Sequence, residues 1–303
     1  MRFDESDRVD ESQIEDRRRG GGFARVGAGL GGLGIIGTLA AVAVRLLSGD
    51  SGGAASELTR ALEGTRRARP AAAAKRGSGA IGGSCQGVTS KTDSGKFVAC
   101  VETNVQSFWK REFARRGDPY RGAKLVLFSN ETTSGCGDAS ASTGPFYCPA
   151  DHKIFLDLGF FRDLTTRFGA QGGDFAEAYV VAHEYGHHVQ NLLGIEPKVR
   201  DLQRKHPKSK NRLSVKLELQ ADCFAGAWGH AAYEKGKVEE GEIDQALDAA
   251  AAVGDDRLQQ RAHGRVAPET FTHGSADERR KWFRRGWDAG DPAACDTFDD
   301  EKG

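Results

Sequence analysis

Apolar residues along the chain form one long uncharged run and several shorter periodic stretches. The run covers residues 26–44 without a single charge, between Arg25 and Arg45. A helix of this length covers roughly 28 Å, at about 1.5 Å per residue, which is close to the hydrocarbon thickness of a bilayer. The pattern therefore predicts one transmembrane helix over residues 25–47. A cleaved signal peptide would have a shorter apolar core nearer its start, and a buried soluble helix would tolerate so many glycines poorly.

The segments on either side of this run have compositions that do not favour a folded core. Residues 1–24 are charged and almost lack large apolar side chains. Residues 48–80 are rich in Gly, Ala, Ser and Arg, which is typical of a flexible linker. We therefore expect a charged tail, a membrane helix, a linker and one folded domain over residues 81–303.

Arginines near the apolar run predict its orientation. Positive charge favours the cytoplasmic side of a membrane helix. More arginines lie close before the run (Arg17, Arg18, Arg19 and Arg25) than after it (Arg45 and Arg60). The sequence thus predicts a single-pass protein of the cell membrane with its N-terminus in the cytoplasm and its domain outside.

The periodic stretches predict an α+β domain that is mainly helical. Residues 96–117, 174–194 and 213–236 carry apolar side chains at helical spacing. The runs 124–128 and 153–158 are short and rich in β-forming residues, so they predict strands of a small sheet.

The second of these helices carries the candidate chemistry. His183 and His187 are four residues apart, so both imidazoles lie on one helix face and can bind the same ion. Glu184 is too close in sequence to bind that ion, but it can deprotonate a water molecule there. Gln190 and Leu193 stand where a metzincin requires a glycine and a third histidine, which excludes that class.

A third ligand is therefore expected from another element, and the third helix offers one. Glu218 and Asp222 share a face at i and i+4. Glu218 can complete a site of two histidines and one glutamate for a single Zn²⁺ ion, and Asp222 can accept the outer N–H of a ligand histidine.

Charge and cysteines narrow the function further. Lys and Arg total 43 and balance 43 Asp and Glu, so the charge predicts no nucleic-acid partner. Six cysteines in the exported domain, with no CxxC pair, favour disulfides over a cysteine zinc site. Of the fifteen possible pairings, we expect Cys136 with Cys148 and Cys223 with Cys295, which leaves Cys85 with Cys100.

With HEYGHHVQ and LELQADCFAGAW both present, the chain resembles the bacterial family of predicted neutral zinc metallopeptidases, membrane-anchored relatives of the gluzincin proteases. The resemblance extends over residues 81–298, and it implies a zincin-like domain with His183, His187 and Glu218 as zinc ligands and Glu184 as the catalytic residue.

The last predicted helix adds two candidate residues. Ser275 and Glu278 form a capping box, with His273 just before the helix and Arg279 in its first turns. This order is similar to a C-terminal motif of membrane gluzincin endopeptidases, and it implies that His273 stabilises the oxyanion with support from Arg279. Tyr185 and His188 are alternative donors.

The sequence therefore predicts a membrane-anchored zinc peptidase that acts on peptides or proteins, with an unspecified oligomeric state. Two other hypotheses remain open, namely a zinc-stabilised binding or assembly module without turnover and a zinc amidohydrolase that acts on cell-wall amides.

Overall fold

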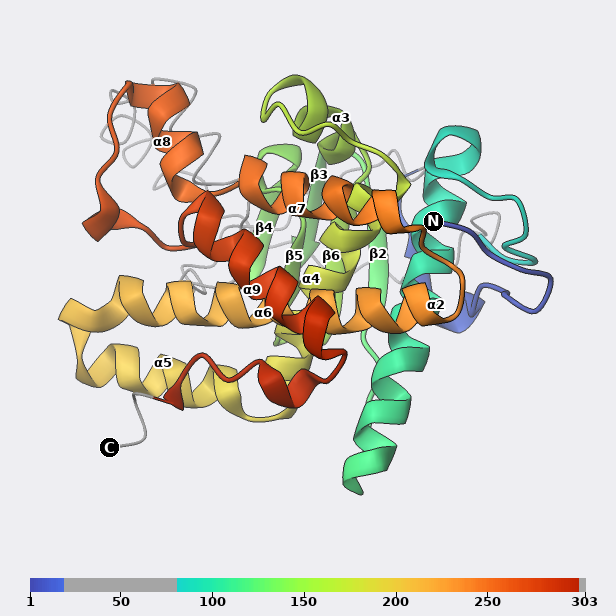
Figure 1. The fold of residues 1–303 in the computed structure, drawn as a ribbon, viewed down its shortest axis with the longest axis horizontal. Coiled ribbons are helices and arrows are strands. Elements are labelled where there is room, and N and C mark those ends of the chain that lie inside the picture. Colours follow the sequence, from blue (N-terminus) through green and yellow to red (C-terminus); the bar gives the residue numbers. More distant parts are fainter. Residues whose placement is uncertain (19–80, 300–303) are drawn as a thin grey trace, which may run out of the picture.

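A computed structural model describes residues 1–18 and 81–299, which form a mainly helical α+β structure with a small sheet (Figure 1). The predicted helix over 25–47 and the linker over 48–80 lie outside these residues. Within the described ranges, no helix is both long enough and apolar enough to span a bilayer. The helices are α2 (Ser90–Arg116), α3 (Gly159–Thr166), α4 (Asp174–Leu192), α5 (Ile195–Lys205), α6 (Lys210–Glu234), α7 (Ile243–Ala252), α8 (Asp255–His263) and α9 (Ala276–Ala289). The strands are β1 (Ile14–Asp16), β2 (Lys124–Phe128), β3 (Glu131–Ser134), β4 (Gly137–Ser140), β5 (Phe146–Cys148) and β6 (Lys153–Asp157).

Helix α6 packs against both α4 and α9 in the middle of the molecule (Figure 1). Two glycines allow this close packing. A Cβ atom on Gly186 of α4 would lie 2.9 Å from the Ala221 Cα of α6, and one on Gly286 of α9 would lie 1.9 Å from the Cys223 carbonyl oxygen. Any larger residue at these positions would force the helices apart. The small residues therefore bring the main chains of these helices close together around the candidate site.

The sheet has four strands in the order β1-β2-β6-β5. Strand β2 is parallel to both β1 and β6, and β5 runs antiparallel to β6 with Tyr147 opposite Ile154. Strands β3 and β4 form a separate antiparallel pair. The predicted strands 124–128 and 153–158 correspond to β2 and β6 and are confirmed. Their apolar side chains are buried on both faces of the sheet, in the main core on one face and in a smaller cluster with β4 and β5 on the other.

The N-terminal segment corrects the prediction of a separate charged tail over 1–24. Met1, Phe3 and Val9 are buried in the main core, and β1 is hydrogen-bonded to β2. Lys153 of β6 binds Glu15 at 2.8 Å, so charged residues also contribute to this packing. A few well-placed apolar residues thus suffice for docking, although their average content is low.

Residues 1–18 and 81–299 contact each other directly. The run 26–44, on which the predicted orientation depends, lies outside the described residues. The orientation therefore stays a prediction.

All three predicted disulfides are confirmed. Cys85 pairs with Cys100, Cys136 with Cys148, and Cys223 with Cys295. The last of these joins α6 to the segment that follows α9, across a sequence separation of 72 residues. The C-terminal segment is thereby fixed beside the helices that carry the candidate site.

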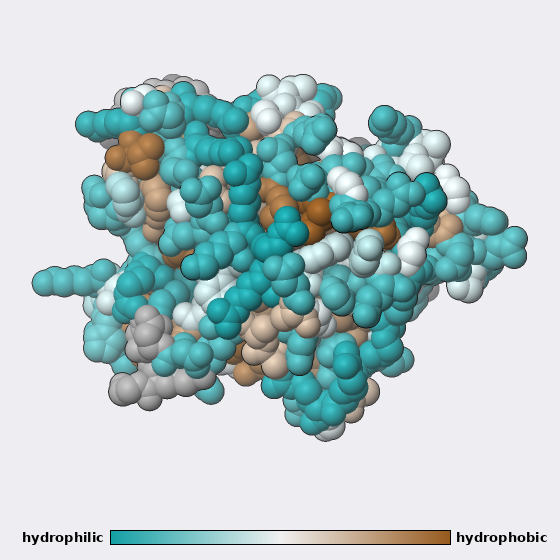
Figure 2. All heavy atoms as spheres, in the orientation of Figure 1, coloured by the Kyte–Doolittle hydropathy of each residue, from teal (hydrophilic) through white to brown (hydrophobic). Residues whose placement is uncertain are grey.

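Helix ends agree with most of the predicted signals. Gly117 ends α2 with φ 75°, and the Ser275–Glu278 capping box begins α9. Gly173 occupies the N-cap position of α4, and the Asp174 carboxylate accepts hydrogen bonds from the main-chain N–H and the hydroxyl of Ser90. On the face shown in Figure 2, hydrophilic side chains predominate and hydrophobic ones are confined to small areas between them.

Candidate metal centre

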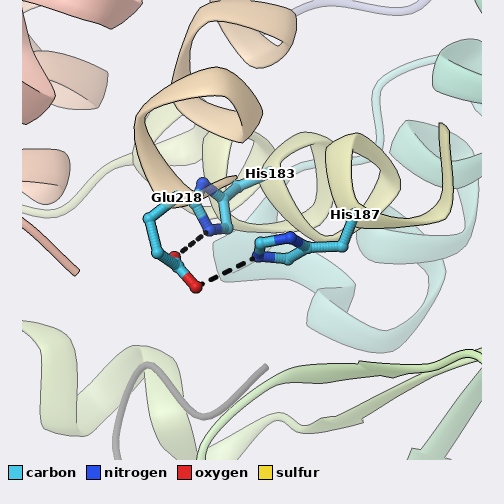
Figure 3. A group of neighbouring side chains, drawn as sticks. All are labelled: His183, His187 and Glu218. Carbon is cyan, nitrogen blue, oxygen red and sulfur yellow. Dashed lines mark hydrogen bonds and ion pairs between the residues drawn. The ribbon is translucent and has the colours of Figure 1, made fainter. Parts of the chain in front are cut away.

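His183 and His187 project from α4 toward Glu218 of α6 (Figure 3). The His183 Nε2 atom lies 3.2 Å from one Glu218 carboxylate oxygen, and the His187 Nε2 atom lies 3.6 Å from the other. One ligand atom from each residue can be chosen so that all lie within 4.8 Å of one another, and all three side chains are buried. The structure thus brings together the three residues that the sequence predicts as metal ligands.

This cluster fits a zinc ion by its donor chemistry. Two imidazoles and one carboxylate form a common protein ligand set for a catalytic Zn²⁺, which keeps a further position open. Among the described residues, the buried His187 Nε2 atom has no hydrogen-bond partner. A cation bound between the side chains would satisfy this nitrogen. Burial raises the pKa of Glu218, but His187 and His273 more than offset it and hold the carboxylate in its charged form.

A charged cluster supports His183. Its Nδ1 atom lies 2.8 Å from an Asp222 carboxylate oxygen, which also accepts a 2.6 Å hydrogen bond from the Tyr179 hydroxyl. Arg279 of α9 donates to both Asp222 oxygens, at 2.8 and 2.9 Å. Burial alone would raise the pKa of Asp222, but Arg279 and His183 lower it below its usual value. Asp222 therefore has the position predicted for it.

The position of Arg279 differs from the prediction. Its side chain is fully buried behind His183 and is bonded to Asp222 and Tyr179, so it does not support His273. The capping box placed Arg279 correctly near the start of α9. The capping box could not show that the close packing of α6 and α9 turns the Arg279 side of α9 toward Asp222.

An uncharged group supports His187. The Gln190 side-chain oxygen lies 2.9 Å from the His187 Nδ1 atom, and the Gln190 NH₂ group donates to the Leu217 carbonyl oxygen and to Gln220. Gln190 is three residues after His187 on the same helix. Sequence reasoning used Gln190 only to exclude metzincins and did not recognise this contact.

Glu184 lies beside the ligands but binds none of them directly. It is 1% exposed, and neither carboxylate oxygen has a hydrogen-bond partner among the described residues. Burial raises its pKa, while His187 and His183 offset part of that rise. The carboxylate is therefore close to the metal ligands and is available to accept a proton.

His273 is followed by Gly274, where a Cβ atom would lie 3.2 Å from Leu219 of α6, the helix that carries Glu218. Burial lowers its pKa, but the charges of Glu218 and Asp255 raise it above the usual value overall. Its Nδ1 atom is 3.3 Å from one Asp255 oxygen, while the other Asp255 oxygen accepts main-chain hydrogen bonds from Thr272, His273 and Gly274. Asp255 thus fixes the turn that carries His273. It was not singled out from the sequence, where it is one of two adjacent aspartates.

The two alternative oxyanion donors are engaged elsewhere. The Tyr185 hydroxyl donates to Glu102 and also lies 3.2 Å from the Ala123 carbonyl oxygen. The two ring nitrogens of His188 are bonded to the Tyr147 hydroxyl and the Arg121 carbonyl oxygen. Neither group is free to bind a substrate, which favours His273 as the oxyanion donor.

The fold and site together define an α+β protein with a buried His₂Glu centre and a free glutamate beside it. The chain belongs to the family described as putative neutral zinc metallopeptidase, whose model matches residues 1–298.

Relatives of this chain occur in several bacteria. The uncharacterized protein YpfJ of Escherichia coli K12 is 51% identical over 207 residues, which cover 68% of this chain and 72% of the relative. Uncharacterized proteins of Mycobacterium bovis and Mycobacterium tuberculosis are 46% identical over 220 residues, with the same coverage of each chain. No solved structure matches the chain.

Proposed function

We propose that the protein is a zinc-dependent peptidase with one Zn²⁺ held by His183, His187 and Glu218. The observation that carries this proposal is the Glu184 carboxylate, which is buried beside the three ligands without a hydrogen-bond partner of its own in the described part of the chain. A carboxylate without a partner is costly to bury. Its presence next to a metal centre is explained if it serves a reaction.

The chemistry divides between the ion and the side chains. Zinc, when bound, supplies a Lewis acid that polarises a carbonyl group and makes water more acidic. Glu184 accepts a proton from the attacking water and passes it to the leaving amine nitrogen. Because burial raises the pKa of Glu184, the carboxylate is a better proton acceptor than an exposed glutamate.

His273 donates to the oxyanion that develops on the scissile carbonyl. The neighbouring Glu218 and Asp255 favour the protonated imidazole, and the contact with Asp255 at Nδ1 leaves the Nε2–H for the substrate. Asp255 orients the ring and does not contact the substrate itself.

A peptide is the favoured substrate because of strand β5. This strand is the last in the sheet order, so one of its edges is unpaired among the described strands. Strand β5 packs against α4, where the Tyr147 hydroxyl lies 3.1 Å from the Nδ1 atom of His188, four residues after Glu184. An extended peptide that adds to this edge would bring its carbonyl groups near the catalytic carboxylate.

The test is the substitution Glu184→Gln in the full-length protein. This change removes the proton acceptor but none of the ligands, so zinc content is expected to stay near one per chain while cleavage of casein or a peptide library falls by roughly 10²–10⁴. Glu177→Gln, on the same helix, is the matched control and should keep its activity. Unchanged cleavage by the Glu184 variant, or a wild-type protein that binds no zinc, would refute the proposal.

We further propose that residues 1–18 and 81–299 share an oxidising compartment, with the run 26–44 holding the protein at a membrane. The three disulfides support an oxidising compartment. The docking of β1 onto β2 supports the placement of both parts on the same side of the membrane. Cysteines introduced at the exposed Glu5 and Lys281 should react alike with a membrane-impermeant maleimide on spheroplasts. Labelling at 281 alone, with 5 reacting only after permeabilisation, would show that the two parts lie on opposite sides.

A further inference from the structure

A chain of side-chain amides leads away from His187. Gln190 is fully buried, and its NH₂ group donates to the Leu217 carbonyl oxygen at 2.7 Å. A carbonyl oxygen can only accept, so this contact fixes which end of the amide is the oxygen. The Gln190 oxygen therefore faces the His187 Nδ1 atom and requires a proton on it. The His187 Nε2 lone pair is then directed to the metal centre.

The chain continues through α6 to the C-terminal segment. The Gln220 side-chain oxygen accepts from the Gln190 NH₂ group at 3.1 Å, and the Gln220 NH₂ group donates to the Cys295 carbonyl oxygen at 2.9 Å. Cys295 is covalently bonded to Cys223, which lies three residues after Gln220 on α6. Both ends of the Gln220 amide are thus fixed, and the acceptor at its outer end is held in place by a disulfide.

We propose that Gln190 and Gln220 are positioning residues that hold His187 in its metal-binding tautomer and orientation, with the Cys223–Cys295 disulfide holding the outer end of the chain. This inference rests on the zinc site of the proposed function, but not on catalysis. Partners of a ligand histidine fix its ring and influence metal affinity by about 10-fold to 100-fold. Gln190 meets the histidine directly, whereas Gln220 acts through Gln190, so the two effects should differ in size.

Methionine is the informative substitution because it keeps the volume of glutamine and removes the hydrogen bonds. In full-length Gln190→Met, zinc affinity is expected to fall by about 10-fold to 100-fold, and in Gln220→Met by less than about 10-fold. The matched control is Gln203→Met. Gln203 is another buried glutamine, and its amide bonds the Lys210 carbonyl oxygen and the Ser214 hydroxyl, away from the metal centre. This control should lose stability without losing zinc affinity.

Zinc affinity is measured by competition with a chelator, and the geometry is followed by the visible absorption of the Co²⁺-substituted protein. If Gln190→Met binds zinc as tightly as the wild type while it unfolds as easily as Gln203→Met, the residue is only structural and the inference is wrong. If the wild type binds no zinc, the proposed function itself fails. The two failures are therefore distinguishable without an activity assay.

The disulfide is tested separately with paired serine substitutions. Cys223→Ser with Cys295→Ser releases the Cys295 carbonyl oxygen, so zinc affinity should fall by a few-fold, as in Gln220→Met. Cys136→Ser with Cys148→Ser removes a bridge between strand segments outside the amide chain and should leave zinc affinity unchanged. Equal losses in both pairs would show that disulfides act only on overall stability and would overturn the coupling.

Discussion

The two ligand histidines of α4 are supported in opposite ways. His183 is bonded to a carboxylate, Asp222, which is itself neutralised by the buried guanidinium of Arg279. His187 is bonded to a neutral amide, Gln190, which leads to a second amide. The first support joins α4, α6 and α9 by charge, and the second joins α4 and α6 to the C-terminal segment by neutral hydrogen bonds.

This difference separates stability from metal affinity. A buried ion pair that loses one partner leaves an uncompensated charge, which is strongly destabilising. A neutral amide that is replaced by an apolar residue costs much less, because only hydrogen bonds are lost. We therefore expect changes on the His183 side to affect both folding and metal binding, and changes on the His187 side to affect mainly metal binding.

The largest effect is expected from Arg279→Met. It leaves the Asp222 carboxylate buried without its cation, so the free energy of unfolding of the metal-free protein should fall by about 3–5 kcal/mol. Arg284→Met, an exposed change on the same helix, should stay within about 0.5 kcal/mol of the wild type. Denaturant unfolding measures both variants. Similar stabilities for the two would show that Asp222 does not depend on Arg279.

The second-largest effect is expected on zinc affinity. Asp222→Asn keeps an oxygen that can accept from His183 but removes the negative charge that makes the imidazole a stronger ligand. Zinc affinity should fall by about 100-fold, toward the upper end of the range for such partners and further than in Gln190→Met. Asp288→Asn, an exposed change on α9, is the control. Equal losses in the Asp222 and Gln190 variants would mean that charge makes no difference between the two supports.

The smallest effect is a change of stability with pH that is expected from His188, the neighbour of the ligand His187. His187 lies 3.6 Å from the Glu218 carboxylate, whereas burial lowers the pKa of His188 to about 4. In the unfolded chain His188 titrates near 6.5, so between pH 6.5 and pH 4 the unfolded state binds a proton that the folded state excludes. Stability should therefore fall as the pH falls through this window.

This contribution is isolated by comparison with His188→Gln. Burial raises the pKa of Glu102 to about 7, which gives the opposite slope near pH 5 to 7, but that contribution is common to both proteins. Between pH 6.5 and pH 5 the wild type should lose about 1.6 kcal/mol relative to the variant. Parallel stability curves would contradict the neutral, buried state of His188.

Residues whose positions follow from helix periodicity could be predicted from the sequence. The spacing of His183 and His187 and of Glu218 and Asp222 places each pair on one helix face, and the structure brings them together. The contacts of Gln190 could not be predicted in this way, because they depend on how closely α4 approaches α6 at Gly186.

The fold was predictable to a similar extent. Strands β2 and β6 are apolar runs and were recognised, whereas β1 is only three residues long and polar at two of them. Its position in the sheet depends on tertiary contacts such as that of Glu15 with Lys153. Composition averaged over residues 1–24 therefore gave the wrong prediction, since it could not register a few anchoring side chains.

The pairing of β1 with β2 has a consequence for biosynthesis. Residues 14–16 leave the ribosome early, but their hydrogen-bonding partners at 125–127 follow more than a hundred residues later. Contacts so distant in sequence carry a large entropic cost of loop closure and form slowly. The start of the polypeptide must therefore wait for strand β2, and the sheet can be completed only after much of the chain has been synthesised.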